Sequence, residues 1–284
     1  EELCSDASID AIVQITSDDA HAPIAIDALN AGKHVYLEKP MATNLPDARC
    51  MVEAAERNQR QLMIGYMKRY DSGFELAQSI INGLISSGEL GVVTHARGYC
   101  FGGDWISNIG PSEVTDEPYP EIETRSPRWL KEDRIRAFYE FNNLYCHNIN
   151  LVRYLLGDVH ALRFATLDGA TKLLVLAMDG YDVILNLGRV SANFWDEGFK
   201  VYFEDGWVKI HSPPPMLRNV PAKVFVYKAG SINQHFQPQA VWDWAFRRAD
   251  EHFVECIASG TPVRSSGADS IRDLELVEEA FRYF

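Results

Sequence analysis

The sequence predicts an α/β fold in which part of a doubly wound parallel sheet is followed by an α+β domain with a large, mostly antiparallel sheet. Within residues 1–65, short apolar runs alternate with helical segments, a pattern typical of βαβ units and a parallel sheet. Residues 159–228 contain apolar runs separated by tight-turn signals, which is typical of antiparallel strands. The pattern changes near residue 68, so we predict one domain at 1–68 and a second at 69–284.

The first domain is predicted to alternate three strands with two helices. The strands are expected at residues 10–15, 34–37 and 61–65. The first helix should cover residues 20–31 and stop at Gly32, where a left-handed residue is wanted. Asn44, with Asp47 three residues later, is expected to cap a second helix that runs to Arg60.

The second domain is predicted to combine helices with a larger sheet. Its expected elements are a helix at 74–86, a strand at 92–99, a helix at 138–156 and an antiparallel meander between 159 and 228. Asp179-Gly180 and Asp205-Gly206 are signals of tight hairpins. Two helices close the chain, and Ser266 with Asp269 predicts a capping box on the last one.

The first domain has a physical weakness. A parallel sheet of three strands is a thin layer with bare edges. The sequence also has no GxGxxG turn between a strand and a helix, which is the usual cradle for dinucleotide phosphates. It stops inside a predicted helix at Phe284. We therefore expect a truncated, processed or incompletely ordered form of a larger protein, or a second chain that covers this edge.

Composition excludes several functions. The net charge of −13 argues against a nucleic-acid or anionic-membrane surface. No run of apolar residues is long enough to span a membrane. The cysteines are odd in number and form no CxxC pair, which favours free thiols in a reducing compartment and no metal site: Cys4, Cys50, Cys100, Cys146 and Cys256. These features predict a cytoplasmic protein without nucleic-acid or membrane partners.

Several motifs stand in a characteristic order along the chain. They are Ile15-Thr16-Ser17, His21, Ala31-Gly32-Lys33-His34-Val35, Glu38-Lys39-Pro40, Gly65-Tyr66-Met67-Lys68-Arg69-Tyr70, and His147 in the helix ending Leu155-Leu156-Gly157. Together they closely resemble the glucose–fructose oxidoreductase / inositol dehydrogenase / rhizopine-catabolism (Gfo/Idh/MocA) oxidoreductase family. The resemblance covers nearly the whole chain except an insertion at 102–136. It implies a partial Rossmann domain and NAD or NADP as cofactor.

Lys39 is the first candidate for catalysis. It stands just past the end of a predicted parallel strand, where open α/β sheets bind their ligands. From position alone, a solvated loop lysine is the alternative. The resemblance implies that Lys39 hydrogen-bonds the hydroxyl being oxidised, beside the nicotinamide. We also predict a cis peptide bond between Lys39 and Pro40.

A polar stripe on the helix at 138–156 supplies the second candidate. Asn143, His147 and Asn150 are spaced so that they share one face of that helix. The resemblance implies that His147 faces the substrate and accepts a proton, which suits an imidazole; a satisfied core histidine is the alternative. The family commonly has an aspartate where this chain has Asn143, so the usual relay lacks its carboxylate here. The predicted catalytic residues are Lys39, His147 and Asn143.

Other residues are assigned to ligands by the same resemblance. The nicotinamide end of the cofactor is expected to meet Thr16, Ser17, His21, Glu38, Lys39 and Pro40. The alternatives are simple helix caps for Thr16 and Ser17 and a surface histidine for His21. The substrate is expected to contact Tyr66, Arg69, Asn150, Trp105 and Trp129. For the two tryptophans the reason is that indole faces can stack on sugar rings. An ion pair for Arg69, and tryptophans that anchor a surface loop, are the alternatives.

The sequence thus predicts an NAD(P)-dependent dehydrogenase that acts on a secondary alcohol of a sugar, glycoside or inositol. A redox-assisted glycoside-cleaving enzyme on the same fold is one alternative. A non-catalytic sugar-binding or partner subunit is another, motivated by Asn143 and by the absent glycine-rich turn. The resemblance also implies a homo-oligomer formed through the C-terminal sheet.

Overall fold

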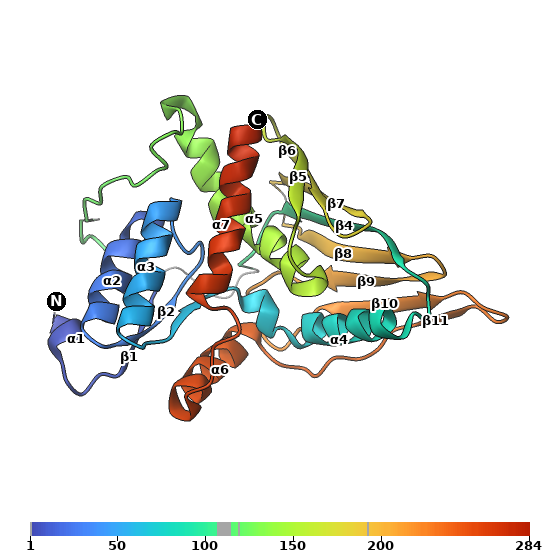
Figure 1. Cartoon of the computed structure of the whole chain (residues 1–284), viewed down its shortest axis with the longest axis horizontal. Helices are drawn as coiled ribbons and strands as arrows, with labels where there is room; N and C mark the ends of the chain where they lie inside the picture. Colours follow the sequence, from blue (N-terminus) through green and yellow to red (C-terminus); the bar gives the residue numbers. More distant parts are fainter. Residues whose placement is uncertain (1, 107–114, 119, 192) are drawn as a thin grey trace. The chain divides into compact units, whose positions relative to one another are not determined.

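The computed structural model describes residues 2–106, 115–118, 120–191 and 193–284 (Figure 1). The chain forms two compact units. The parallel-sheet unit comprises Glu1–Tyr66, Val114–His147 and Ala249–Phe281, and the large-sheet unit comprises Met67–Glu113, Asn148–Arg248 and Arg282–Phe284. The chain therefore returns to the parallel-sheet unit twice after residue 66. This grouping in space is distinct from the division of the sequence near residue 68, which stays a prediction.

The parallel-sheet unit is built around three strands in the order β1-β2-β3, paired in parallel. The strands are β1 (Ala11–Gln14), β2 (His34–Leu37) and β3 (Leu62–Ile64), which confirms the three predicted strands. A short helix, α1 (Glu2–Ser5), precedes them. Helices α2 (His21–Asn30) and α3 (Leu45–Arg57) lie side by side and provide the crossovers between the strands (Figure 1).

Local signals explain where these elements end. Gly32 has φ +78°, so it adopts the left-handed conformation that stops α2, as predicted. Asn44 caps α3: its Oδ1 accepts a hydrogen bond from the Asp47 backbone N–H at 2.9 Å. Helix α7 (Gly267–Tyr283) begins after Ser266, whose hydroxyl oxygen accepts from the Asp269 N–H at 3.2 Å. The caps at Gly32 and Asn44 are confirmed, and of the predicted capping box the structure describes the bond between the Ser266 hydroxyl and the Asp269 N–H.

One edge of the small sheet is covered by the same chain. The Ile64 N–H donates to the Ser265 carbonyl at 2.8 Å, and the Ser265 hydroxyl donates back to the Ile64 carbonyl at 2.7 Å. A single antiparallel bridge joins Met63 to Ser266. The segment between α6 (Ala245–Ser259) and α7 thus satisfies backbone groups along β3.

The large-sheet unit contains eight strands in the order β11-β10-β9-β8-β4-β7-β6-β5. They are β4 (Val93–Gly102), β5 (Ala161–Thr166), β6 (Thr171–Ala177), β7 (Asp182–Arg189), β8 (Asp196–Phe203), β9 (Gly206–Ser212), β10 (Lys223–Lys228) and β11 (Gln234–Phe236). All neighbouring pairs are antiparallel except β4 and β7, which are parallel. This mixed, mostly antiparallel sheet confirms the predicted fold class.

Two details of the predicted meander were wrong. Strands β7 and β8 follow each other along the chain, but β4 lies between them and pairs with both. A pairing between segments this far apart in sequence leaves no local signal. At the second hairpin, Phe203 pairs with Gly206, so the two-residue loop is Glu204-Asp205 and Gly206 is already in β9. The expected Asp-Gly turn is displaced by one residue.

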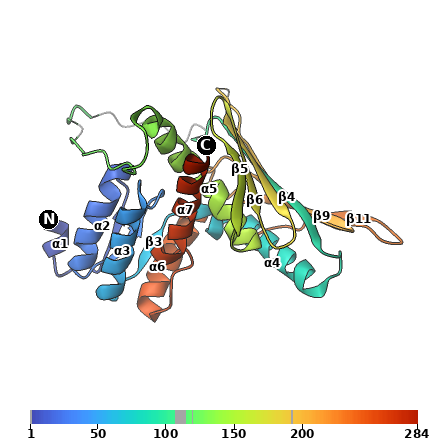
Figure 2. The ribbon, with the colours of Figure 1, turned by 45° about the horizontal axis from the view of Figure 1, so that its top comes forward.

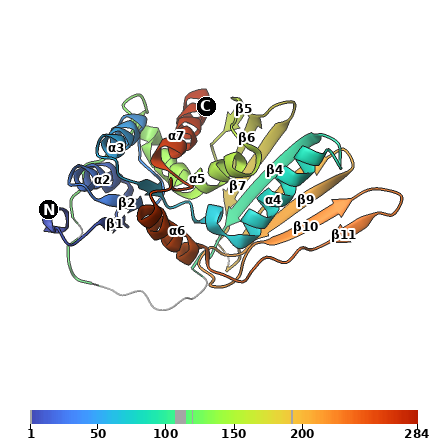
Figure 3. The ribbon, with the colours of Figure 1, turned by 60° about the horizontal axis from the view of Figure 1, so that its bottom comes forward.

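Alternating burial gives the large sheet one covered face. Val201 and Phe203 on β8, and Val208 and Ile210 on β9, are almost fully buried, whereas the residues between them are half-exposed or exposed. Helix α4 (Ser72–Ser87) packs against β9 and β10, as Figures 2 and 3 show. The hydrophobic core of this unit therefore lies between α4 and the sheet.

The bounds of the remaining helices differ from the predicted residue ranges. Helix α5 (Ile135–Leu156) starts three residues before the predicted helix and contributes to both units. The short 3₁₀ helices are η1 (Asp18–Ala20), η2 (Met67–Tyr70) and η3 (Glu132–Arg134). Among the helices that the structure describes, none combines the length and apolar character needed to cross a membrane.

Candidate active site

The three chain segments that follow β1, β2 and β3 lie at the same edge of the parallel sheet, because the strands are in register. Gln14 is level with Leu37, and Leu37 is level with Ile64, so the three strands end together. The Glu38 N–H donates to the Gln14 carbonyl at 3.0 Å, and the Gly65 N–H donates to the Leu37 carbonyl at 2.8 Å. The turns that follow the strands carry the predicted cofactor residues. The carboxyl edge of a parallel sheet is where open α/β folds bind ligands.

His21 fastens two of these turns together. The peptide bond between Lys39 and Pro40 is cis, as predicted. The Nδ1 atom of His21 lies 2.8 Å from the Pro40 carbonyl oxygen, and its Nε2 lies 3.1 Å from the Thr16 carbonyl oxygen. Burial lowers the pKa of His21, against the opposing effect of these carbonyls and of Asp18. His21 is only 1% exposed, so the alternative of a surface histidine is wrong.

The side chain of Lys39 is held against helix α5. Its Nζ donates to the backbone carbonyl of Asn143 at 3.0 Å and to the Asn143 Oδ1 at 3.2 Å. The Nδ2 of Asn143 in turn lies 3.1 Å from both carboxylate oxygens of Asp18. Lys39 is half-buried, so these bonds are made in a partly desolvated setting. Lys39 and Asn143, two of the three predicted catalytic residues, are thus in direct contact.

His147 lies one helical turn beyond Asn143 on α5. Its ring meets the ring of Tyr66 edge to face, with centroids 5.9 Å apart and planes at 81°. Tyr66 follows β3 and is 2% exposed, so it is a fixed neighbour for the imidazole. His147 itself is half-buried. Lys39, Asn143, Tyr66 and His147 all belong to the parallel-sheet unit.

Glu38 supports the Lys39 turn from the other side. Its Oε2 accepts a hydrogen bond from the Lys39 backbone N–H at 3.1 Å. Burial raises the pKa of the Glu38 carboxyl, while the contact with Lys39 opposes this effect. Gly65 gives the carboxyl room: a Cβ there would come within 3.1 Å of the Glu38 carboxyl carbon. A side chain at the position after β3 would therefore crowd the Glu38 carboxyl.

The turn after β1 presents two hydroxyl groups. Thr16 Oγ1 accepts a hydrogen bond from the Gln14 amide at 3.1 Å. Ser17 precedes η1 at the N-cap position, but its side chain makes no capping hydrogen bond. Within the described part of the chain, the buried Ser17 Oγ has no hydrogen-bond partner. The simple-cap alternative is therefore wrong for Ser17.

The other predicted substrate residues are divided between the two units. In the large-sheet unit, Arg69 Nε donates to Asn150 Oδ1 at 2.8 Å, and both side chains are buried. Trp105 belongs to the same unit and is 51% exposed. Trp129 belongs to the parallel-sheet unit, where its Nε1 donates to Glu278 Oε2 at 3.0 Å.

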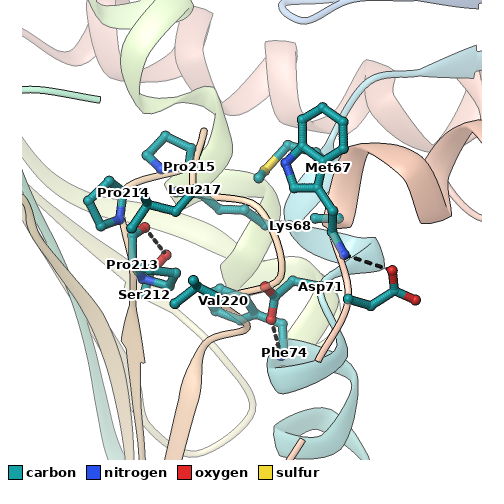
Figure 4. A pocket seen from close by; sticks show the side chains of 13 residues that line it. Met67, Lys68, Asp71, Phe74, Ser212, Pro213, Pro214, Pro215, Leu217 and Val220 are labelled. Atoms are coloured by element: carbon teal, nitrogen blue, oxygen red, sulfur yellow. Dashed lines mark hydrogen bonds between the residues drawn. The ribbon is translucent and has the colours of Figure 1, made fainter. Parts of the chain in front are cut away.

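A small pocket of the large-sheet unit is lined in part by Lys68 (Figure 4), which belongs to a buried ion pair that was not predicted from the sequence. Its lining includes Lys68, Asp71 and the run Pro213–Pro215. Lys68 forms an ion pair with Glu197, and Glu197 Oε1 also accepts from Asn148 Nδ2 at 3.1 Å. Both partners of the ion pair are almost fully buried, so each neutralises a charge that would otherwise be costly.

Two further carboxylates, Asp18 and Asp19 at the start of η1, were not predicted from the sequence. Asp18 faces Asn143, while Asp19 accepts hydrogen bonds from the Arg125 backbone N–H and from the Tyr139 hydroxyl. The available signal was two carboxylates directly after Thr16-Ser17, at the same strand end as the predicted cofactor residues. Among the described residues, no group of His, Cys, Asp and Glu side chains is arranged to hold a metal ion.

Comparison with known proteins gives the same assignment. A family model described as "Oxidoreductase family, NAD-binding Rossmann fold" matches residues 1–66. The inositol 2-dehydrogenase of Salmonella typhimurium is 38% identical over 101 residues, which cover 34% of this chain and 29% of that protein. The inositol 2-dehydrogenase 3 of Saccharopolyspora erythraea is 29% identical over 279 residues, which cover 91% of this chain and 70% of that protein.

The similarity of fold extends over both units. The crystal structure of an aldose–aldose oxidoreductase from Caulobacter crescentus, complexed with glycerol, matches with a TM-score of 0.73 and 22% identity. The match covers 99% of this chain and 79% of that chain. The motif order, the fold and these relatives agree. Residues 1–66 belong to the Gfo/Idh/MocA oxidoreductase family, as part of its NAD-binding Rossmann domain, and the chain as a whole is similar in sequence to an inositol 2-dehydrogenase and in fold to an aldose–aldose oxidoreductase.

Proposed function

We propose that this protein is an NAD(P)-dependent dehydrogenase that oxidises a secondary alcohol of a sugar, glycoside or inositol. The observation that carries the proposal is the position of Lys39, whose ammonium is held at the carboxyl edge of the parallel sheet by Asn143. Two of its three N–H groups are directed at Asn143, and the third can donate to a substrate hydroxyl. The names of the relatives, two inositol 2-dehydrogenases and an aldose–aldose oxidoreductase, support a polyol or sugar substrate.

His147 is the proposed general base. Its imidazole would accept the proton of the substrate hydroxyl while Lys39 stabilises the developing alkoxide oxygen. The edge-to-face contact with Tyr66 would limit rotation of the ring and so keep one nitrogen directed at the substrate. Asn143 would position Lys39 instead of relaying protons itself, because an amide does not ionise in this pH range.

The turns at the carboxyl edge suit the nicotinamide end of the cofactor. NAD(P)⁺, when bound, would supply the acceptor for the hydride that leaves the carbinol carbon. The buried Ser17 hydroxyl, which lacks a partner within the described residues, is available to a ribose hydroxyl or a carboxamide. Thr16, Glu38 and Pro40 would shape this end of the site. His21 would hold the turn in place, since both its ring nitrogens face backbone carbonyls.

Roles for the remaining residues follow from their contacts. Tyr66 would border the substrate through its contact with His147. Within the large-sheet unit, the buried Arg69–Asn150 pair would join η2 to α5 and so offer polar side chains to a substrate bound there. Exposed Trp105 and Trp129 are the side chains that would stack on a sugar ring. Substitution of each tryptophan by Leu should raise the KM for a glycoside more than it changes kcat.

Calorimetric titration with NAD and NADP, followed by a coupled assay on a panel of inositols, aldoses and glycosides, tests the proposal. The expected result is binding of one cofactor and formation of reduced cofactor in step with ketone. His147→Asn should lower kcat by about 10²- to 10⁴-fold, the usual contribution of a general base. Failure of both cofactors to bind would refute the dehydrogenase assignment. Release of an aglycone without net cofactor reduction would instead establish glycoside cleavage.

Self-association through the large sheet is a second part of the proposal. On the face opposite α4, Trp207 stacks on Tyr227 with ring centroids 5.8 Å apart, and Lys200 lies 4.0 Å above the Trp207 ring. These three side chains are half-exposed and adjoin one another across β8, β9 and β10. Surfaces of this kind commonly mark protein–protein interfaces. Light scattering should give more than one chain per particle, and Trp207→Glu should lower that number.

A further inference from the structure

Asn143 stands between a cation and an anion. Its Oδ1 accepts from Lys39 Nζ at 3.2 Å, and its Nδ2 lies 3.1 Å from each carboxylate oxygen of Asp18. The orientation of the amide is therefore determined by its neighbours. An ammonium can only donate and a carboxylate can only accept, so the carbonyl must face Lys39 and the NH₂ must face Asp18. All three residues belong to the parallel-sheet unit.

We propose that Asp18 is the positioning carboxylate of the active site, and that it holds Lys39 in place through the amide of Asn143. This inference rests on the proposed function of Lys39 as the donor to the substrate hydroxyl. The carboxylate fixes the rotamer of Asn143 through charge-assisted hydrogen bonds and increases the negative charge on its carbonyl oxygen. The carbonyl then holds the Lys39 ammonium in one place, with its remaining N–H directed away from Asn143.

The contacts of Asp18 argue against a merely structural role. Asp18 is the first residue of η1, a position where a carboxylate often caps backbone N–H groups. Within the described part of the chain, however, its carboxylate accepts hydrogen bonds from Asn143 alone. Its neighbour Asp19 has the structural contacts, with the Arg125 backbone and the Tyr139 hydroxyl. The two adjacent carboxylates therefore have separate roles.

The charges around the turn support the same assignment. His21, which fastens the Lys39–Pro40 turn, experiences both groups: Asp18 raises its pKa and Lys39 lowers it, and burial has the largest effect. Asp18 thus offsets the positive charge that Lys39 brings into a partly desolvated site. The direct partner of the Lys39 ammonium in α5 is the uncharged Asn143. Without Asp18, no carboxylate would lie behind that amide.

The test exchanges the two side chains. Asp18→Asn keeps the shape and removes the charge, and Asn143→Asp places a second carboxylate against Asp18. Each single variant should lower kcat by about 10- to 100-fold, the usual effect of losing a hydrogen bond to a charged group. The change in KM should be smaller, because the substrate still reaches the site. The double variant restores one carboxylate and one amide in reversed order and should recover most of the activity.

A second readout requires neither cofactor nor substrate. Acylation of Lys39 by acetic anhydride is followed by mass spectrometry of its peptide and normalised to exposed Lys223 in the same digest. Release of Lys39 from Asn143 should raise its acylation rate about tenfold in the Asp18→Asn variant, with return toward the original rate in the double variant. Asp27→Asn removes an exposed carboxylate from α2 and should change neither readout.

The outcomes separate this inference from the proposed function. Unchanged Lys39 acylation in Asp18→Asn, or a double variant no better than the single ones, would overturn the role of Asp18. Altered acylation with recovery in the double variant supports it, even if no sugar or polyol is oxidised; in that case the dehydrogenase assignment fails alone. Thermal unfolding of every variant ensures that the comparison is made on folded protein.

Discussion

The guanidinium of Arg125 donates two parallel hydrogen bonds to the Asp47 carboxylate, with Nε 2.6 Å from Oδ2 and Nη2 2.8 Å from Oδ1. The same residue is tied down by its backbone, since its N–H donates to Asp19 and its carbonyl accepts from Thr43 and Asn44. Asp47 lies in the first turn of α3, where a carboxylate also favours the helix dipole. One arginine therefore fixes the segment after residue 120 to the turns that carry the candidate site.

The first prediction concerns this pair. Arg125→Lys keeps the charge but loses the planar fork, so the free energy of unfolding should fall by about 1 kcal/mol, a value limited by partial solvent exposure. Asp47→Asn should cost about as much, and the double variant should cost less than the sum of the two. Urea unfolding measures all three. Full additivity would show that the two side chains do not interact energetically.

Two glycines of α4 give a matched pair for the second prediction. A Cβ at Gly73 would lie 2.0 Å from the backbone oxygen of Ala222, and Ala222 cannot move away without breaking the hydrogen bond from its N–H to Asp71 Oδ1. At Gly83 a Cβ would meet nothing within 4 Å, and the position is exposed.

Gly73→Ala should therefore destabilise the protein by about 1–3 kcal/mol or more through overpacking. Gly83→Ala should stabilise it by about 0.5–1 kcal/mol, because alanine loses less backbone entropy in a helix. Differential scanning calorimetry on both variants provides the comparison. Equal shifts in Tm would contradict the packing of α4 against the β10 segment.

The sequence predicted the elements that depend on neighbouring residues. Strand β2 covers the predicted residues 34–37. Helix α3 begins after Asn44 and helix α2 stops before Gly32, as expected, because capping needs partners a few residues away. The position of β4 between β7 and β8 was not predicted. Its pairing joins segments about a hundred residues apart, where neither strand carries a local signal of its partner.

The candidate site shows the same division. The motif order identified Lys39, and helical spacing placed Asn143 and His147 on one helix. The contact between Lys39 and Asn143 spans 104 positions, and that between Asn143 and Asp18 spans 125. An aspartate in the first turn of a helix usually interacts with the helix N-terminus, so its sequence position did not single out Asp18. Only the folded chain distinguishes it from Asp19.

The third prediction concerns the free thiols. Burial raises the pKa of Cys146 to about 12 and also raises that of Cys100, so neither forms the reactive thiolate near neutral pH. Cys50 is exposed on α3. Iodoacetamide should therefore modify Cys50 in the native protein and reach Cys100 and Cys146 only after denaturation. Peptide mass spectrometry before and after addition of guanidinium gives the answer, and early loss of Cys146 would contradict its burial.

The last prediction is a dependence of stability on pH through His21. Burial lowers the pKa of His21 below its ordinary value of 6.5, with Asp18 and two carbonyls in partial opposition. Between the folded and the unfolded pKa, the unfolded chain binds more protons, so this contribution to stability is full above 6.5 and is lost as pH falls through the folded pKa.

The free energy of unfolding should therefore fall between about pH 7.5 and about pH 5.5, with a share from His34 and His211, whose pKa values burial also lowers. His21→Asn should be less stable at the higher pH, because it cannot span the Thr16 and Pro40 carbonyls, and should show a shallower slope. His160→Asn, at an exposed position, is the matched control and should keep the original slope. Parallel slopes for His21→Asn and the unmodified protein would mean that His21 titrates equally in both states, and burial would then not govern its charge.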